Sequence, residues 1–419
     1  MFAWLANAWR VPELRRRVLF TLGILAVYKF GSWLPAPGLA KNAVNNTGSS
    51  GGVSSLLNLL SAGGFSRGAL FSVGIQAYVT ASIILQLLTT AIPSLERLQK
   101  EGEAGQMRIN QYSRYLTVAL AAATSTGYSF LFKKEGLLAS SSPGTILLLI
   151  LSLTAGATLL MWLGEQITKR GVGNGISIII VASILSSAPA AISSWLGPST
   201  TSTGRLFMPI VILAVIVAVV FVMEGQRRIP VQYARRQLGG RESSASTSTY
   251  MPLSVNMAGV IPVIFALAPL SIAQTIGGFK PSWNLWIQAN FSFTSWKYLV
   301  AEVLLIFTFT YFYTSVVFNP VEQADNLRKS NGYIPGIRPG PPTAAYLDRV
   351  LTRLTFFGAL FLAAVAVAPS IFESQFHFPQ TATRFLGGTS VLIVVGVALM
   401  TMRQMESQMA MRHYEGFLR

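Results

Sequence analysis

Ten long apolar runs dominate this sequence, and each is close to the length that a helix needs to cross a lipid bilayer. About 20 predominantly apolar residues are enough to span the hydrocarbon core. The pattern therefore predicts an all-α, polytopic membrane protein of about ten transmembrane helices. The runs cover residues 18–34, 70–92, 115–132, 145–163, 176–196, 207–223, 253–276, 298–318, 354–371 and 385–402.

Composition supports this class of protein. Only 11% of the 419 residues are charged, against about 25% in a typical soluble chain, so the surface is too apolar for an ordinary globular protein. Lys and Arg number 32 and Asp and Glu 15, which gives a formal net charge of +17. Such an excess favours acidic partners such as lipid headgroups or nucleic acid.

Basic loops alternate with loops that carry few charges, and this alternation predicts the orientation. Cytoplasmic loops of membrane proteins are enriched in Lys and Arg. Basic clusters precede the first run and recur within residues 97–114, 227–241 and 328–353, all on the same side of the predicted spans. We therefore expect both termini in the cytoplasm.

An even number of spans permits two pseudo-symmetric halves that insert in opposite directions, as in many transport proteins. We expect a first half at residues 1–196, an external hinge loop at 197–206 and a second half at 207–419. The second half would carry cytoplasmic loops at 224–252 and 319–353. No convincing repeat of residues accompanies this division, so the duplication is a hypothesis from topology alone.

The sequence contains few motifs that are typical of an enzyme active site. It lacks the phosphate-binding pattern GxxxxGK[ST], contains no cysteine, and has two histidines, His377 and His413, that lie outside the apolar runs. A nucleophile with a histidine base, or a histidine metal site, is therefore not expected inside the membrane. We predict a protein that is not an enzyme and that holds no cofactor or metal.

An ion-coupled secondary solute transporter with inverted repeats is the alternative function. Such transporters place ionisable residues deep inside their spans. Within the runs of this chain, Lys29 and Glu302 are the exceptions to a nearly uncharged pattern, and both lie near helix ends. Side chains at such positions reach the interface, so coupled transport is disfavoured but stays open.

Residues 53–67 break the helical pattern. They form about three apolar turns followed by Gly63 and Gly64, which is too short to span a membrane. Such a half-helix is either held at membrane depth, covered by protein or a water-filled cavity, or lies on the external surface. The sequence leaves both alternatives open.

Two pairs of aliphatic residues are spaced four apart, and two polar residues interrupt apolar runs. The pairs are Ile75 with Val79 and Ile176 with Ile180; the polar residues are Thr80 and Asn256. Inside transmembrane helices, such pairs are usually packing or lipid contacts, and such polar groups usually form ordinary interhelical hydrogen bonds. Periodicity alone therefore identifies no pore.

Six stretches carry a family resemblance. They are RVLFTLGILAVYKFGSWLPAPG from Arg17, WLGEQITKRGVGNGISIII from Trp162, QRRIPVQYARRQ from Gln226, VNMAGVIPVIFA from Val255, VVFNPVEQADNLRKSNGYIPGIRPG from Val316 and GGTSVLIVVGV from Gly387. In order, and over essentially the whole chain, they resemble the SecY family, the central subunits of the bacterial Sec protein-conducting channel. The resemblance implies translocation of unfolded polypeptides across the bacterial cytoplasmic membrane and lateral release of transmembrane segments into lipid.

The resemblance also implies a fold, in which two inverted halves form a clamshell around an hourglass pore. The helices beginning near Gly74 and Leu253 would form the lateral gate, with Thr80 and Asn256 at polar gate positions. A plug would close the pore from outside. Its expected residues lie within 53–67 and are Leu56, Leu57, Leu60, Gly63, Gly64 and Arg67.

Carried over by position, the family's constriction ring consists of six aliphatic residues. A narrow aliphatic ring excludes liquid water and hydrated ions, yet it offers a passing peptide no hydrogen bonds that would retain it. Two positions depart from the family pattern: Ala77 stands where proline is common, and Val79 is smaller than the usual isoleucine. The ring residues are Ile75, Val79, Ile176, Ile180, Ile264 and Ile393.

The two basic loops match the family's cytoplasmic projections, which dock the ribosome and the SecA motor ATPase. The resemblance further implies SecE and SecG as partner subunits, and polypeptides with signal sequences as substrates. Anionic membrane lipids are an expected partner of the basic excess. The expected docking residues are Arg227, Arg228, Arg235, Arg236 and Arg338.

Overall fold

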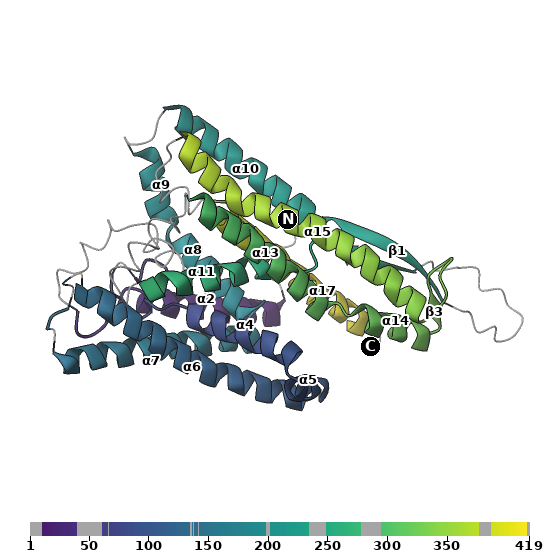
Figure 1. Cartoon of the computed structure of the whole chain (residues 1–419), viewed down its shortest axis with the longest axis horizontal. Coiled ribbons are helices and arrows are strands. Elements are labelled where there is room, and N and C mark those ends of the chain that lie inside the picture. The colour runs from purple at the N-terminus through teal and green to yellow at the C-terminus, as the bar shows by residue number, and fades with distance from the viewer. Residues whose placement is uncertain are drawn as a thin grey trace, which may run out of the picture.

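Two groups of long helices lie against each other in the computed structural model, and a small β-sheet projects from one end (Figure 1). The helices of the first group precede residue 198, and those of the second follow residue 201. The structure describes residues 11–39, 61–65, 67–134, 136, 138–140, 142–197, 202–233, 249–277, 295–376 and 387–416.

The two groups differ in their accessory elements. In the first group, the short helix α5 follows a sharp bend after α4. The helices of this group are α2 (Pro12–Gly31), α4 (Gln76–Ala91), α5 (Pro93–Lys100), α6 (Glu103–Lys134), α7 (Pro143–Arg170), α8 (Gly175–Ser186) and α9 (Ala188–Leu196). The second group also carries the β-sheet. Its helices are α10 (Ser202–Glu224), α11 (Ile261–Gly277), α13 (Trp296–Val317), α14 (Pro320–Lys329), α15 (Pro341–Phe376) and α17 (Gly388–Gly416).

Each of the predicted apolar runs overlaps at least one of these helices. In the described part of the chain, six helices are long and apolar enough to cross a membrane, and α4 with α5 forms a seventh candidate that is bent by 99°. The apolar parts of α10 and α11 are shorter. The prediction of a helical, polytopic membrane protein is confirmed.

Two predicted runs become helical later than their apolarity suggested. The run at 70–92 is helical from Gln76, and the run at 253–276 is helical from Ile261. A glycine with positive φ precedes each start by two residues: Gly74 at 62° and Gly259 at 63°. Glycine adopts this conformation readily, so in both groups the backbone turns immediately before a helix that reaches the centre of the molecule.

The start of α8 shows how the sequence sets a helix boundary near the same centre. The side-chain oxygen of Asn174 accepts hydrogen bonds from the backbone N–H groups of Ile176 (3.0 Å) and Ser177 (3.4 Å), which caps the helix. A Cβ on Gly175 would overlap the carbonyl of Gly164 on α7. Because Gly175 has none, α8 begins directly against α7.

A small antiparallel sheet, of order β2-β1-β3, was not predicted from the sequence. Strand β1 (Gln226–Tyr233) pairs along its length with β2 (Thr249–Ser254), and its last two residues pair with β3 (Gly332–Tyr333). Ile229 and Val231 alternate inward along β1, as expected of a strand with one buried face. The sheet therefore joins the two loops that were expected to project into the cytoplasm.

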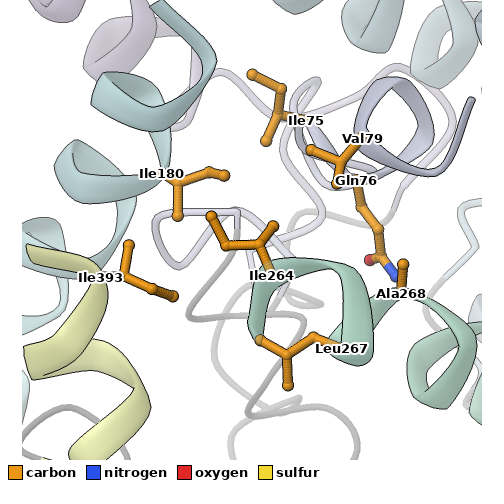
Figure 2. Close-up of a pocket in the computed structure, with 8 residues that line it drawn as sticks. All are labelled: Ile75, Gln76, Val79, Ile180, Ile264, Leu267, Ala268 and Ile393. Atoms are coloured by element: carbon orange, nitrogen blue, oxygen red, sulfur yellow. The ribbon is translucent and has the colours of Figure 1, made fainter. Parts of the chain in front are cut away.

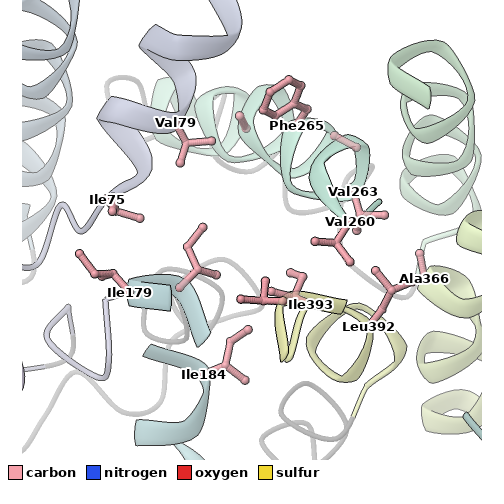
Figure 3. Packing of buried hydrophobic residues seen from close by; sticks show 14 of the residues in the cluster. Ile75, Val79, Ile179, Ile184, Val260, Val263, Phe265, Ala366, Leu392 and Ile393 are labelled. Carbon is pink, nitrogen blue, oxygen red and sulfur yellow. The ribbon is translucent and has the colours of Figure 1, made fainter. Parts of the chain in front are cut away.

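The two groups of helices meet along two seams. One seam is formed by α8 against α17, and the other by α4 and α6 against α11. Between them lies one large cluster of buried hydrophobic residues. Figure 3 shows part of this cluster, which includes Ile184 of α8, Val263 of α11 and Leu392 of α17.

Candidate functional site

Five of the six expected ring residues line one cavity between the two groups of helices. Ile75 and Val79 come from the start of α4, and single isoleucines come from three further helices (Figure 2). The remaining lining residues are Gln76, Leu267 and Ala268. The three single isoleucines are Ile180 of α8, Ile264 of α11 and Ile393 of α17.

Four of the five ring side chains that line the cavity are almost fully removed from the surface, whereas Ile264 is partly exposed. Ile75, Ile180 and Ile393 are each 2% exposed, and Val79 is 7% exposed. Figure 3 shows Ile75 and Val79 on one side of the interior and Ile393 on the other. Ile176, the sixth expected residue, packs against the same cluster but does not line the cavity.

The cavity is narrow. Its volume is about 20 Å³, and a cavity needs roughly 10–15 Å³ on this scale to hold a single water. An aliphatic wall gives such a water almost no partners, so the constriction resists ions and their hydration shells. A polypeptide can pass only if the surrounding helices move apart.

The chain just before α4 is folded into tight turns. The Ser61 hydroxyl accepts a hydrogen bond from the backbone N–H of Phe65 at 3.0 Å. The Phe65 ring lies 5.1 Å from the Tyr128 ring and 5.5 Å from the Phe132 ring, both on α6. Of the expected plug residues, Gly63, Gly64 and Arg67 are in this region, whereas Leu56, Leu57 and Leu60 lie outside the described residues.

A strap of backbone hydrogen bonds joins this region to the end of α2. The N–H of Ala36 donates to the carbonyl of Gly68, and the N–H of Leu70 donates to the carbonyl of Leu34, both at 2.8 Å. The Arg67 guanidinium lies over the Trp33 ring, 4.8 Å from its centroid. The residues that follow the expected plug are therefore fixed to the first helix.

The two helices expected to form a lateral gate, α4 and α11, are in contact. Thr80 is buried on α4, one residue beyond the ring position Val79. Asn256 is buried in the turn before α11, where its amide donates to the carbonyl of Gly259 at 2.9 Å and contacts Met223 Sδ at 3.4 Å. Asn256 is thus bound within its own turn and to α10, rather than to Thr80.

The exposed arginines of the two basic loops lie on and beside the sheet. Arg227 and Arg228 project from β1, and the Arg228 guanidinium lies 4.8 Å from the ring centroid of Tyr250 on β2. Tyr333 of β3 donates a hydrogen bond to the side-chain oxygen of Gln232 at 2.9 Å. Pairing of β1 with β3 therefore brings the two basic loops together.

Arg338 is exposed in the turn between β3 and α15. The turn is stabilised by a hydrogen bond from the Thr343 hydroxyl to the Arg338 carbonyl at 2.8 Å, and Gly336 and Gly340 both have positive φ. The guanidinium is thus presented from a defined backbone. Arg235 and Arg236 lie outside the described residues.

Sequence reasoning missed three of the cavity's lining residues. Leu267 and Ala268 lie one turn beyond Ile264 on α11, and a search of that helix at three- and four-residue spacing from Ile264 would have found them. Gln76 is one of several polar residues in an apolar run and gives no periodic signal. Glu302, the buried acid on α13, is not among the lining residues. The described residues hold no group of His, Cys, Asp and Glu able to bind a metal.

These features define a class of protein: a polytopic helical membrane protein whose two groups of helices surround a narrow, largely aliphatic constriction. Residues 69–402 match the family model described as SecY. The chain is 44% identical over 440 residues to the protein translocase subunit SecY of Streptomyces scabiei, and the comparison covers 100% of both chains. The chain belongs to the SecY family.

Solved structures share the fold at lower sequence identity. A structure described as that of a protein conducting channel matches with a TM-score of 0.66 at 18% identity and covers 96% of each chain. Sec61 in the canine ribosome-channel complex from the endoplasmic reticulum matches with a TM-score of 0.62, also at 18% identity and 96% coverage of each chain. At this identity the likeness establishes the fold.

Proposed function

We propose that this chain forms the pore of a protein-conducting channel, through which unfolded polypeptides cross the bacterial cytoplasmic membrane. The observation that carries the proposal is the convergence of aliphatic residues from α4, α8, α11 and α17 on one narrow cavity. A wall that carries no charge and only one polar side chain, Gln76, seals the resting pore against ions and does not retain any particular peptide sequence. Family membership supports the same function.

The seam between α4 and α11 serves as the lateral gate in this proposal. The two helices belong to different groups and line the cavity from adjacent sides. If the groups separate along this seam, the constriction widens and opens to lipid in one movement. An apolar signal sequence or transmembrane segment then leaves the pore sideways, because the hydrocarbon core is its favoured environment.

Energy comes from outside the chain, since its sequence has no phosphate-binding loop. The basic surface on the sheet, together with Arg338, receives the SecA motor or the translating ribosome in alternation. Ribosomal RNA is polyanionic, so Arg227 and Arg228 contribute a salt-dependent part of that affinity. The ribosome-bound canine Sec61 structure has the same fold, which supports this assignment.

Family membership supports the remaining proposed partners. SecE clamps the two halves, SecG binds at the periphery, and anionic lipids neutralise part of the net charge of +17. Both termini lie in the cytoplasm, on the side of the sheet. Neither a cofactor nor enzymatic chemistry is part of the function.

Reconstitution tests the proposal. The chain, co-purified with its small subunits, is placed in lipid vesicles with the motor ATPase, ATP and a secretory precursor. We expect the precursor to become protected from added protease only when both ATP and the chain are present. Equal protection in vesicles that lack the chain would contradict the proposal. Uptake of small solutes down an ion gradient, without protection of the precursor, would favour the transporter alternative.

A further inference from the structure

The constriction of this protein contains one polar side chain. Of the eight residues that line the cavity, seven are aliphatic and the eighth is Gln76. A polar group in the wall of an otherwise apolar seal is costly unless it has a partner. Gln76 does have a polar partner, and so does Ala268 on the opposite helix.

Gln76 reaches across the seam between the two groups of helices. It is the first residue of α4, and Figure 2 shows its side chain extending away from α4 until the amide lies beside Ala268 of α11. The two helices are in contact along this seam. Gln76 therefore lies across the seam between the two helices of the proposed gate.

Helix α11 has a backbone carbonyl acceptor, that of Phe265, close to Ala268. Pro269 lies inside α11 and has no N–H group, so the helix cannot donate its usual hydrogen bond to the carbonyl of Phe265. Phe265 and Ala268 are three residues apart and share a face of the helix. An amide that lies beside Ala268 is therefore close to a backbone carbonyl that lacks its usual donor within the helix.

We propose that Gln76 is a polar clasp across the lateral gate, and that it sets how apolar a segment must be to open the gate. This inference rests on the proposed function. When α4 and α11 separate, the amide loses its place on α11 and faces either lipid or an apolar signal segment. An apolar residue at the same position would exchange one apolar contact for another with little change in free energy, because lipid is as apolar as leucine.

Replacement of Gln76 by methionine tests the clasp. Methionine has nearly the same length and volume but no amide. We expect Gln76→Met to raise the export of a precursor with a marginally apolar signal by about three- to thirtyfold, the range for one interhelical hydrogen bond in a membrane. Export of a precursor with a strongly apolar signal should not change, because that signal already opens the gate.

The assay uses precursors whose signal core is graded from alanine-rich to leucine-rich, with the complete complex in vesicles. Thr90→Val is the matched control, since it removes a polar group from an exposed position on the same helix. Thermal unfolding of both variants in detergent shows whether the fold is intact. Gln76→Asn, which keeps the amide but shortens its reach, should shift the threshold in the same direction as methionine.

The outcomes separate this inference from the proposed function. The threshold is the apolarity that a signal segment needs for export. If the unaltered chain exports strongly apolar precursors and Gln76→Met lowers this threshold more than Thr90→Val does, the clasp is supported. If export proceeds normally and both variants leave the threshold unchanged, the clasp is refuted and the channel function stands. If the unaltered chain exports no precursor, the proposed function itself has failed.

Discussion

The guanidinium of Arg67 stacks over the indole ring of Trp33, with 4.8 Å between Cζ and the ring centroid. Trp33 lies just after α2, and Arg67 ends the segment expected to form the plug. The backbone strap between residues 34–36 and 68–70 lies beside this contact. Any movement that frees the end of the segment must therefore break the cation–π contact or pivot around it.

Trp33→Leu is expected to raise the ion conductance of the resting channel. An exposed cation–π contact contributes about 0.5–1 kcal/mol, so its loss should shift the balance between closed and open states by roughly two- to fivefold. The measurement is the steady current across a planar bilayer without precursor. Phe30→Leu is the control, because Phe30 is an exposed aromatic residue at the end of α2. Equal currents for the two variants would remove the role assigned to Trp33.

Truncation of side chains in the aliphatic ring is expected to raise the ion conductance of the resting channel. Ile180→Gly and Ile393→Gly each remove a side chain that is 2% exposed and lines the cavity. A cavity that now holds about one water would then admit several, so we expect ion flux to rise by about fivefold or more. Leu185→Gly places the same helix-weakening residue on α8 at a position that is 52% exposed. Unchanged conductance in both ring variants would argue against the seal.

Much of the fold could be predicted from the sequence because length and apolarity are local properties. The runs that became α6, α7 and α13 needed no tertiary information. The resemblance placed the start of α4 near Gly74, close to its position in the structure, whereas the late start of α11 was missed because Gly259 delays the helix without changing the mean hydropathy. The sheet was missed for a different reason: two buried residues, Ile229 and Val231, make a short alternation that the neighbouring arginines obscure.

The candidate site was predictable only in part. Family resemblance named the aliphatic ring, whereas periodicity could not separate pore residues from lipid-facing ones. The structure brings five of the six to one cavity and leaves Ile176 beside it. Gln76 was missed because its significance depends on Ala268, which lies 192 positions away in the chain and close to it only in the fold (Figure 2).

Arg338→Glu is expected to abolish motor-driven export while the channel remains folded. The side chain is exposed and its turn is held through backbone atoms, so the substitution reverses a surface charge without disturbing the turn. ATP-dependent protection of a precursor in vesicles is the measurement. Arg353→Glu, at an exposed position on α15, is the control for net charge. Export that survives Arg338→Glu would show that the motor docks elsewhere.

The ion pair between α6 and α7 is expected to stabilise the first group of helices. Arg114 donates from Nε to Glu165 Oε1 at 2.7 Å and from Nη2 to Oε2 at 2.6 Å, a bidentate geometry that is stronger than a single contact. The Arg114 side chain is 41% exposed, so solvent screening limits the expected loss in Glu165→Gln to about 1 kcal/mol.

Thermal unfolding in detergent measures this loss, and a second pair supplies the control. Glu96 and Lys100 form an exposed ion pair within α5, which should contribute about 0.5 kcal/mol or less. Glu165→Gln should therefore lower the unfolding temperature clearly more than Glu96→Gln does. If the two changes are equal, the pairing of α6 with α7 does not depend on this contact.

The passage of a polypeptide through the aliphatic constriction is tested most directly by cross-linking. The chain has no cysteine, so Ile180→Cys, Ile393→Cys and Leu185→Cys each introduce a single thiol. A precursor with one cysteine is stalled during export and oxidised at a series of chain positions. We predict disulfides with Ile180→Cys and Ile393→Cys at the same precursor positions, and none with the outward-facing Leu185→Cys. Disulfides with Leu185→Cys alone would place the path outside the cavity and contradict the account.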